Sequence, residues 1–208
     1  WLKYEDAAEF IYQAVEMSKM PSIAKKDEKN QLAGSLKLKE DTGQEMTASL
    51  KGNNHYEMNK AYRSGTRFRI YLNNDQPAYV YALGSDNSNK VFQVFPHKKG
   101  VSPALNYSKS SVPIPSEDQH IRMDGNIGTD YLCVIYSKLP LNLDDLKKSI
   151  SKQSSRYSFQ EKVQRVLGSQ LMSGQEVEYN SKNGVMSFKA AAKGKSIATL
   201  FVKMEHID

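Results

Sequence analysis

Cysteine is almost absent from this sequence, which contains one residue of that type, Cys133, among 208. The chain therefore forms no internal disulfide. Cys133 falls in the run Tyr131–Tyr136, which predicts a buried strand, so we expect it to act as a small buried hydrophobic residue. The lack of disulfides does not assign a compartment, because many envelope proteins also lack them.

Long hydrophobic runs are missing as well. No stretch approaches the roughly 20 apolar residues that a membrane-spanning helix requires, so we expect no transmembrane segment. The composition, 39% hydrophobic and 25% charged, is that of an ordinary globular protein. The length allows one large domain, or one domain with appendages, with a sizeable core.

The sequence also lacks the common catalytic motifs: a Walker-type loop, a G-x-S-x-G elbow and an H-E-x-x-H pair. The pair most similar to a metal site is Asp118 with His120, but two ligands do not make a site, and a solvated loop is the favoured interpretation. Cys133 with His97 or His120 lacks the local signature of a cysteine peptidase. We therefore expect no enzyme activity, no metal and no cofactor.

Basic residues outnumber acidic ones, but the excess is not concentrated in one part of the chain. The net charge is +6 and the isoelectric point is about 9.2. Residues 51–141 and 142–208 each carry 11 basic and 7 acidic side chains, and residues 1–50 carry 7 and 9. Because the excess is spread along the chain, it predicts a solvated basic surface and not a nucleic-acid-binding patch.

The most informative stretch is Thr66–Pro96, which contains three strand-length runs separated by two polar turn clusters. The first run alternates apolar and polar residues, as a half-buried strand requires. The second, Tyr79–Leu83, is apolar on both faces and predicts a more central strand. The third, Val91–Phe95, ends at Pro96. Together they predict a three-stranded antiparallel meander.

The chain before this stretch begins with an amphipathic pattern over residues 3–19, followed by a polar segment, Ser22–Gln31. We interpret residues 1–31 as an N-terminal helix and linker, and residues 32–208 as a β-rich domain with a helical insertion at about 142–168. The helix is expected to dock on the sheet, on a partner or on a missing domain. Because the chain starts at Trp1 and not Met, we expect a processed product whose signal peptide is not present in this chain.

Further strands and helices follow from alternation, capping and turn signals. Expected strands are Leu32–Lys39, Met46–Leu50, an edge segment at Val112–Pro115, Tyr131–Tyr136 and Ile197–Met204; expected helices are Leu143–Ile150, capped by Asn142, and one opening with the capping box of Ser158 and Glu161; a hairpin is expected at Asn183-Gly184. The fold class is therefore a β-dominated α+β protein. It is an antiparallel β-sandwich or a strongly curved sheet with an N-terminal helix and two C-terminal helices.

Several motifs occur in the order typical of one bacterial family. They are Tyr62–Thr66, Pro77–Leu83, Val94–Pro96, Val112–Pro115 and Gly128–Ser137. Over residues of about 62–141 the chain resembles the DUF4384 family, a domain of unknown function. The resemblance implies an extracytoplasmic β-rich module, located in the periplasm or at the cell surface. Such modules are sometimes joined to caspase-like peptidase or kinase domains. The family has no established catalytic residues to carry over.

The resemblance favours a non-enzymatic binding or accessory module of the bacterial cell envelope, a subunit or terminal domain of a larger assembly. Its partner is expected to be a protein or another envelope component. The alternative is a regulatory or substrate-presenting C-terminal domain of a caspase-like peptidase whose catalytic part is absent. The sequence does not fix the ligand, the partner or the oligomeric state.

A candidate binding surface combines aromatic residues of the first two meander strands with basic residues on the strand and in the loop after Pro96. Exposed tyrosines would form a stacking platform, and the cations would suit an acidic partner. Core packing of the tyrosines and a mobile loop are the simpler alternatives. The candidate residues are Arg67, Arg69, Tyr71, Tyr79, Tyr81, His97, Lys98 and Lys99.

Overall fold

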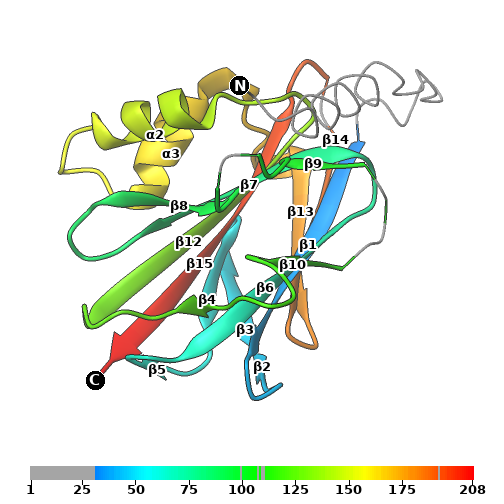
Figure 1. Ribbon diagram of the computed structural model, residues 1–208. Coiled ribbons are helices and arrows are strands. Elements are labelled where there is room, and N and C mark those ends of the chain that lie inside the picture. Colours follow the sequence, from blue (N-terminus) through cyan, green and yellow to red (C-terminus); the bar gives the residue numbers. More distant parts are fainter. Residues whose placement is uncertain (1–30, 99, 107, 109–110, 192) are drawn as a thin grey trace, which may run out of the picture.

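The computed structural model describes residues 31–98, 100–106, 108, 111–191 and 193–208. Two β-sheets face each other, and two helices lie on the outer face of one of them (Figure 1). The expected N-terminal helix and linker fall almost entirely outside the described residues. None of the helices in the described ranges is long and apolar enough to cross a membrane.

The first sheet has the strand order β10-β6-β1-β14-β13, with β2 pairing β1 and β11 pairing β6. All of its pairs are antiparallel. Its strands are β1 (Gln31–Glu40), β2 (Glu45–Met46), β6 (Arg67–Asn74), β10 (Val112–Ile114), β11 (Ile121–Arg122), β13 (Val177–Lys182) and β14 (Val185–Ala191).

The second sheet has the order β3-β4-β15-β12-β7-β8, with β5 pairing β15 and β9 pairing β7. β15 pairs β4 and β5 in parallel, so the fold is not purely antiparallel as the sequence had suggested. Its strands are β3 (Ala48–Gly52), β4 (His55–Met58), β5 (Tyr62–Arg63), β7 (Ala78–Ser85), β8 (Val91–Phe95), β9 (Ala104–Leu105), β12 (Gly128–Ser137) and β15 (Ile197–Ile207).

The main core lies between the two sheets and follows from strand alternation. In β6 the buried residues Phe68, Ile70 and Leu72 alternate with exposed or half-buried neighbours, as a strand with one covered face requires. The predicted strands at the N-terminal end of the domain, in the middle and at the C-terminus are confirmed as β1, β12 and β15. The outcome is a β-sandwich.

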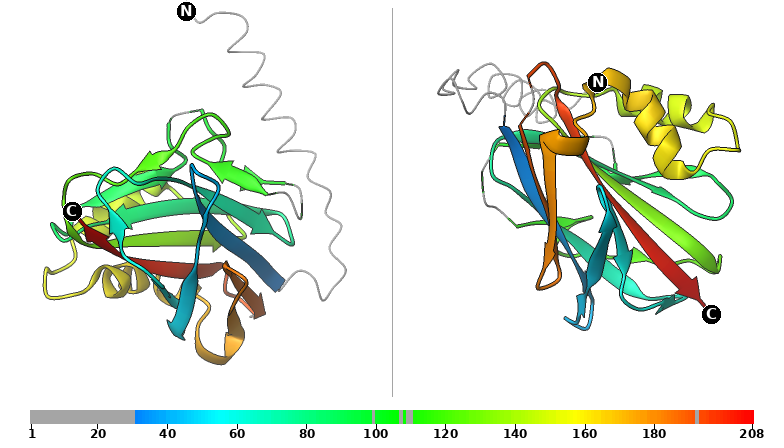
Figure 2. Two further views of the ribbon diagram at one scale, coloured as in Figure 1. Left: turned by 90° about the horizontal axis from the view of Figure 1, so that it is seen from below. Right: turned by 180° about the vertical axis from the view of Figure 1, so that it is seen from behind.

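A second core lies under the helices α2 (Leu143–Ser151) and α3 (Phe159–Leu167), which cover the outer face of the second sheet (Figure 2). Both predicted caps are confirmed: the Asn142 side chain accepts from the amide of Asp145, and Ser158 and Glu161 form the capping box. Two short 3₁₀ helices, η2 (Gly168–Gln170) and η3 (Gly174–Glu176), lead into β13.

Two buried tyrosines connect the two sheets by hydrogen bonds. Tyr136 on β12 donates its hydroxyl proton toward the carbonyl oxygens of Ser35 and Asn73, at 2.9 and 3.0 Å. Tyr56 on β4 reaches the carbonyl oxygens of Asn180 and Ser187 in the same way, at 3.1 and 2.9 Å. Both rings cross the core from the second sheet to backbone of the first, so they fix the lateral position of one sheet on the other.

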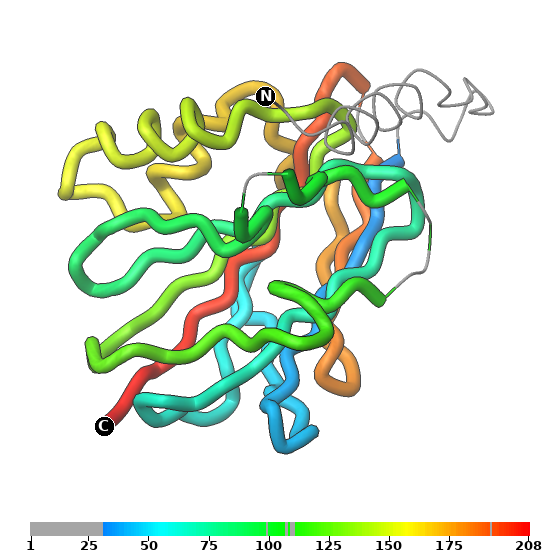
Figure 3. Tube along the Cα trace, in the orientation of Figure 1, coloured from blue at the N-terminus to red at the C-terminus, as the bar shows by residue number. Residues whose placement is uncertain are grey.

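The predicted meander over Thr66–Pro96 is wrong in its first pairing. β7 and β8 pair as expected, but β6 belongs to the first sheet and β7 to the second. The tube in Figure 3 follows the chain from one sheet to the other at this point. Asn74, which is fully buried, donates its side-chain amide to the carbonyl oxygens of Gln76 and Leu105 at 2.8 and 3.1 Å, and so stabilises the crossover.

The expected strand Met46–Leu50 is divided between the two sheets in a similar way, as β2 and β3. β2 pairs β1, whereas β3 leaves the first sheet to pair β4 in the second. The hairpin between β13 and β14 is confirmed, with positive φ angles of 52° at Asn183 and 72° at Gly184, as its two-residue turn requires.

Candidate functional site

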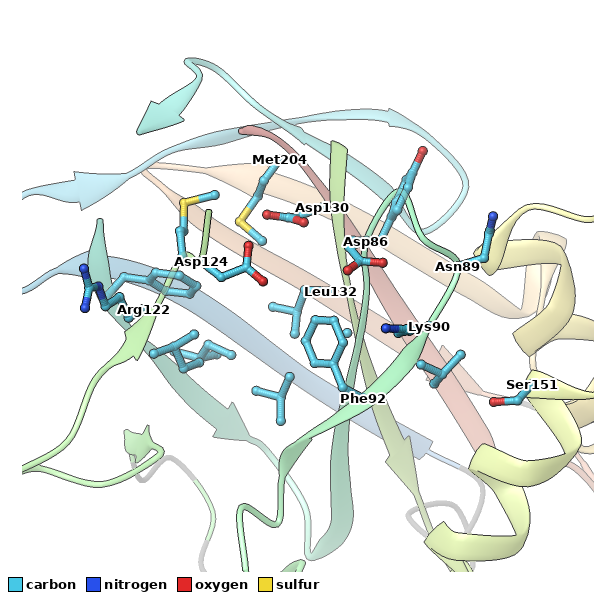
Figure 4. A pocket seen from close by; sticks show the side chains of 18 residues that line it. Asp86, Asn89, Lys90, Phe92, Arg122, Asp124, Asp130, Leu132, Ser151 and Met204 are labelled. Atoms are coloured by element: carbon cyan, nitrogen blue, oxygen red, sulfur yellow. The ribbon is translucent and has the colours of Figure 1, made fainter. Parts of the chain in front are cut away.

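A cleft of about 660 Å³ opens where the first sheet fails to cover the edge of the second. It lies between β8 and the segment around β11, and Figure 4 shows the side chains that line it. Its apolar wall is built from hydrophobic residues of both sheets and of the segment around β11. These are Phe68, Ile70, Val91, Phe92, Val94, Ile121, Met123, Leu132 and Met204.

Phe92 is the residue that most clearly marks this cleft. β8 turns Val91 toward the helices, where it packs on the second core, and turns Val94 toward the main core. By alternation, Phe92 shares the inner side with Val94. It remains 46% exposed, because no strand of the first sheet covers it. Its ring rests on Gly84, whose missing side chain makes room for it.

Charged groups surround the mouth of the cleft: the carboxylates of Asp86, Asp124 and Asp130, with Lys90 and Arg122 (Figure 4). Burial raises the pKa of Asp130 above its usual value, and the neighbouring charges of Asp124 and Asp86 act in the same direction. His206 opposes this shift. The cleft therefore combines an apolar wall with a polar, mainly acidic mouth.

Asp130 also belongs to a chain of three polar side chains that runs inward from the cleft. His206 on β15 is 2% exposed, and its Nδ1 lies 3.1 Å from Asp130 Oδ2. Its Nε2 lies 3.0 Å from Ser64 Oγ. Ser64 follows β5 in a tight turn and lines a second hollow of about 470 Å³ with Gly65, Arg122 and Asp124.

No short sequence motif predicts this chain of residues, because its members are 66 and 76 positions apart. Strand register brings them together: Gly128 is opposite His206 between β12 and β15, and Tyr62 is opposite His206 between β5 and β15. The only local signal was that Ser64 and Asp130 each lie inside a motif of the family resemblance.

The two arginines predicted to bind a partner have structural contacts. Both alternate with the buried residues of β6 and so face away from the core. Arg69 donates to the carbonyl oxygens of Ser116, Glu117 and Gln119 at 2.5–3.2 Å and so holds the loop before β11. Arg67 is exposed and contacts Asp41 at 3.5 Å.

The three candidate tyrosines do not form one platform. Tyr71 lies half-buried on the first sheet, whereas Tyr79 and Tyr81 lie on the second. Tyr81 is buried under the helices, its hydroxyl oxygen accepts from the amide of Leu141 at 2.8 Å, and burial raises its pKa. Tyr79 packs against the same core. For the last two the core-packing alternative is correct.

The loop after Pro96 meets β6 at the end opposite to Arg67. His97 is half-buried and Lys98 exposed, while Lys99 lies outside the described residues. The loop returns to the first sheet where Val112 is opposite Leu72, whereas Arg67 at the other end of β6 is opposite Arg122. The candidate residues are therefore distributed over both sheets and both ends of β6.

The metal and cysteine candidates are also placed by the structure. Among the described residues, no group of three or more His, Cys, Asp or Glu side chains is arranged to hold a metal ion. His120 Nδ1 lies 3.3 Å from an Arg67 guanidinium nitrogen. Cys133 is fully buried beneath the helices, as predicted, and burial raises the pKa of its thiol well above the usual value.

We expect Cys133 to be unreactive in the native protein. The thiolate is the reacting form, and burial both disfavours it and blocks access. Ellman's reagent should modify less than a tenth of the thiol in buffer over an hour, and all of it in about 6 M guanidinium chloride. Rapid modification without denaturant would show that α2 and α3 do not cover this face stably.

One comparison with known proteins, against models of protein families, gives a match. Residues 61–140 match the family model for DUF4384, a domain of unknown function. The resemblance inferred from the sequence is thereby confirmed, with boundaries one residue earlier at each end. No curated protein and no solved structure gives a significant match to the chain.

The DUF4384 segment contributes strands to both sheets, from β5 to β12, and it is completed by strands outside it. β6 pairs β1, and β12 pairs β15 along ten residues of each. Ser64 and Asp130 lie inside the DUF4384 segment, whereas His206 lies outside. The chain of polar residues thus connects this segment to the last strand of the fold.

Proposed function

We propose that this protein is a binding or accessory module of the bacterial cell envelope, which holds an apolar group of a partner protein in the cleft beside β8. The observation that carries the proposal is Phe92, an inward-facing aromatic residue that the fold leaves 46% exposed inside a cleft. Large apolar side chains left uncovered in a concave site are typical of interaction surfaces.

The dimensions and composition of the cleft support this role. Its volume of about 660 Å³ falls within the range of ligand pockets, and it can accept one or two large side chains. The apolar wall favours the burial of such side chains, and the charged mouth orients the chain that carries them. The location in the envelope is part of the proposal and rests on the family resemblance.

Phe92→Ser should weaken the binding of Nile red, a neutral apolar dye, by about tenfold, because the dye loses an aromatic contact worth about 1 kcal/mol together with buried area. The measurement is a fluorescence titration of the full chain. Leu139→Ser is the matched control, since Leu139 is 60% exposed and does not line the cleft. Equal affinity of the two variants for Nile red would argue against binding of the dye in the cleft.

A photo-crosslinking amino acid distinguishes a protein partner from a small ligand. Placed at position 92, it should capture a specific envelope protein in cells, and placed at position 139 it should not. Loss of that adduct in a Gly84→Ala background would link capture to the position of the side chain at residue 92, because a β-carbon on Gly84 occupies the space that the ring of Phe92 fills in the native chain. Capture from both positions alike would contradict a specific site.

A further inference from the structure

The geometry of Ser64, His206 and Asp130 is that of a nucleophile, a base and a group that orients the base. Asp130 Oδ2 accepts from the Nδ1–H of His206 at 3.1 Å, and this contact favours the tautomer whose Nε2 carries no proton. That Nε2 then accepts the hydroxyl proton of Ser64 at 3.0 Å. An adjacent imidazole held in this way makes a serine hydroxyl nucleophilic.

Burial separates the roles of the three residues. His206 is 2% exposed and shielded from water on β15, so its two hydrogen bonds are not lost to solvent. Ser64 is partly exposed and lines the second hollow, the side from which a substrate would reach it. Asp130 is half-buried at the cleft. Ser64 is therefore partly exposed to solvent, whereas His206, which would act as its base, is buried.

The turn that carries Ser64 is fixed by its own backbone. The amides of Ser64, Gly65 and Thr66 donate to the carbonyl oxygens of Ile207, Met123 and Arg63 at 2.9–3.0 Å. These amides are occupied, so they do not stabilise an oxyanion. Arg122 offers a cation that could do so: its guanidinium lies beside Gly65, and the residue lines the same hollow as Ser64.

We propose that Ser64 is an acyl-accepting nucleophile that acts on carboxylic esters. This activity goes beyond the binding function and uses the second hollow, which shares Arg122 and Asp124 with the cleft but is not lined by Phe92. Ser64 Oγ attacks the ester carbonyl carbon while its proton passes to His206 Nε2. The tetrahedral oxyanion forms toward Arg122, the bond to the alkoxy group breaks, and that group leaves as the alcohol with the proton from His206. Water then repeats the sequence and releases the acid.

A fluorophosphonate probe tests the nucleophile directly. Ser64 Oγ displaces fluoride from phosphorus and remains as a stable adduct, which peptide mass spectrometry assigns to a residue. The full chain should be labelled at Ser64, and Ser64→Ala should lose at least nine-tenths of the labelling. Ser88→Ala is the matched control, because Ser88 Oγ contacts a carboxylate of Asp86 but no histidine. Its labelling should be unchanged.

Asp130 is tested as a positioning residue. Asp130→Asn favours the wrong imidazole tautomer and should slow labelling by about 100-fold or more, with Asp130→Glu recovering part of the rate. A purely structural role for Asp130 would change melting and not the labelling rate of the folded fraction. Failure of the folded wild-type chain to label at Ser64, or labelling that Asp130→Asn leaves unchanged, would overturn the proposal.

Hydrolysis of p-nitrophenyl acetate supplies the second readout. The wild-type chain should release p-nitrophenol at a rate that Ser64→Ala reduces to the level of free imidazole in buffer, while Phe92→Ser leaves it unchanged. The Phe92→Ser variant distinguishes the binding function from the esterase activity, since Phe92 lines the cleft and not the second hollow. Turnover that persists in Ser64→Ala would also overturn the role of this serine.

Discussion

Replacing Gly34 with alanine is expected to destabilise the protein by about 2–3 kcal/mol, the cost of overpacking a core that cannot give way. A β-carbon at this position would lie 2.6 Å from Tyr136 Cε1 and 2.8 Å from the carbonyl oxygen of Asn73. The ring cannot swing aside, since its hydroxyl is bonded to the backbone of Ser35 and Asn73. Urea denaturation followed by circular dichroism measures the loss.

Gly52→Ala is the matched control for this change. Gly52 also lies in a strand, but nothing stands within 4 Å of a β-carbon built on it. We expect its effect to stay within about 0.5 kcal/mol, as for other uncrowded surface positions. If both glycine variants unfold at the same urea concentration, the contact between Tyr136 and the first sheet does not fix the sheets as described.

The strands and helices could be predicted from the sequence because their signals are local. Alternation predicted β1 and β6, a buried apolar run predicted β12, and Asn142 and Ser158 marked the two helix starts that the structure confirms. Pairing was harder. The polar turn before Pro77 is compatible with a hairpin and with a change of sheet. In the structure the chain changes sheet, and the buried side chain of Asn74 donates hydrogen bonds at this crossover.

The candidate site was less predictable than the fold, because it depends on which strands pair and not on local signals. The chosen residues were basic and aromatic side chains of one stretch, and the structure uses several of them as internal contacts, notably Arg69 and Tyr81. The cleft depends on which strand edges stay uncovered. The link between Ser64, His206 and Asp130 depends on the register of three strands. Neither property is encoded in a short motif.

Phe201 is a buried aromatic residue beneath the helical layer. It is 1% exposed on β15, and its ring meets that of Phe159 from α3 edge-on, with centroids 6.1 Å apart and planes at 80°. Phe159 also contacts Tyr131 of β12, at 6.4 Å between centroids. Such aromatic pairs contribute beyond their buried area. α3 is therefore attached to the sheet through a small aromatic cluster.

Phe201→Ala is expected to cost about 3–5 kcal/mol, the sum of lost burial and a cavity under α3. The free energy of unfolding from urea titration measures this effect. Phe92→Ala removes the same atoms from a ring that is 46% exposed, so it should cost less than about 1 kcal/mol. Accelerated amide exchange confined to α2 and α3 in Phe201→Ala would show that the helices loosen before the sandwich. Equal losses in the two phenylalanine variants would mean that α3 does not bury Phe201, because the cost of the truncation follows the apolar area that it exposes.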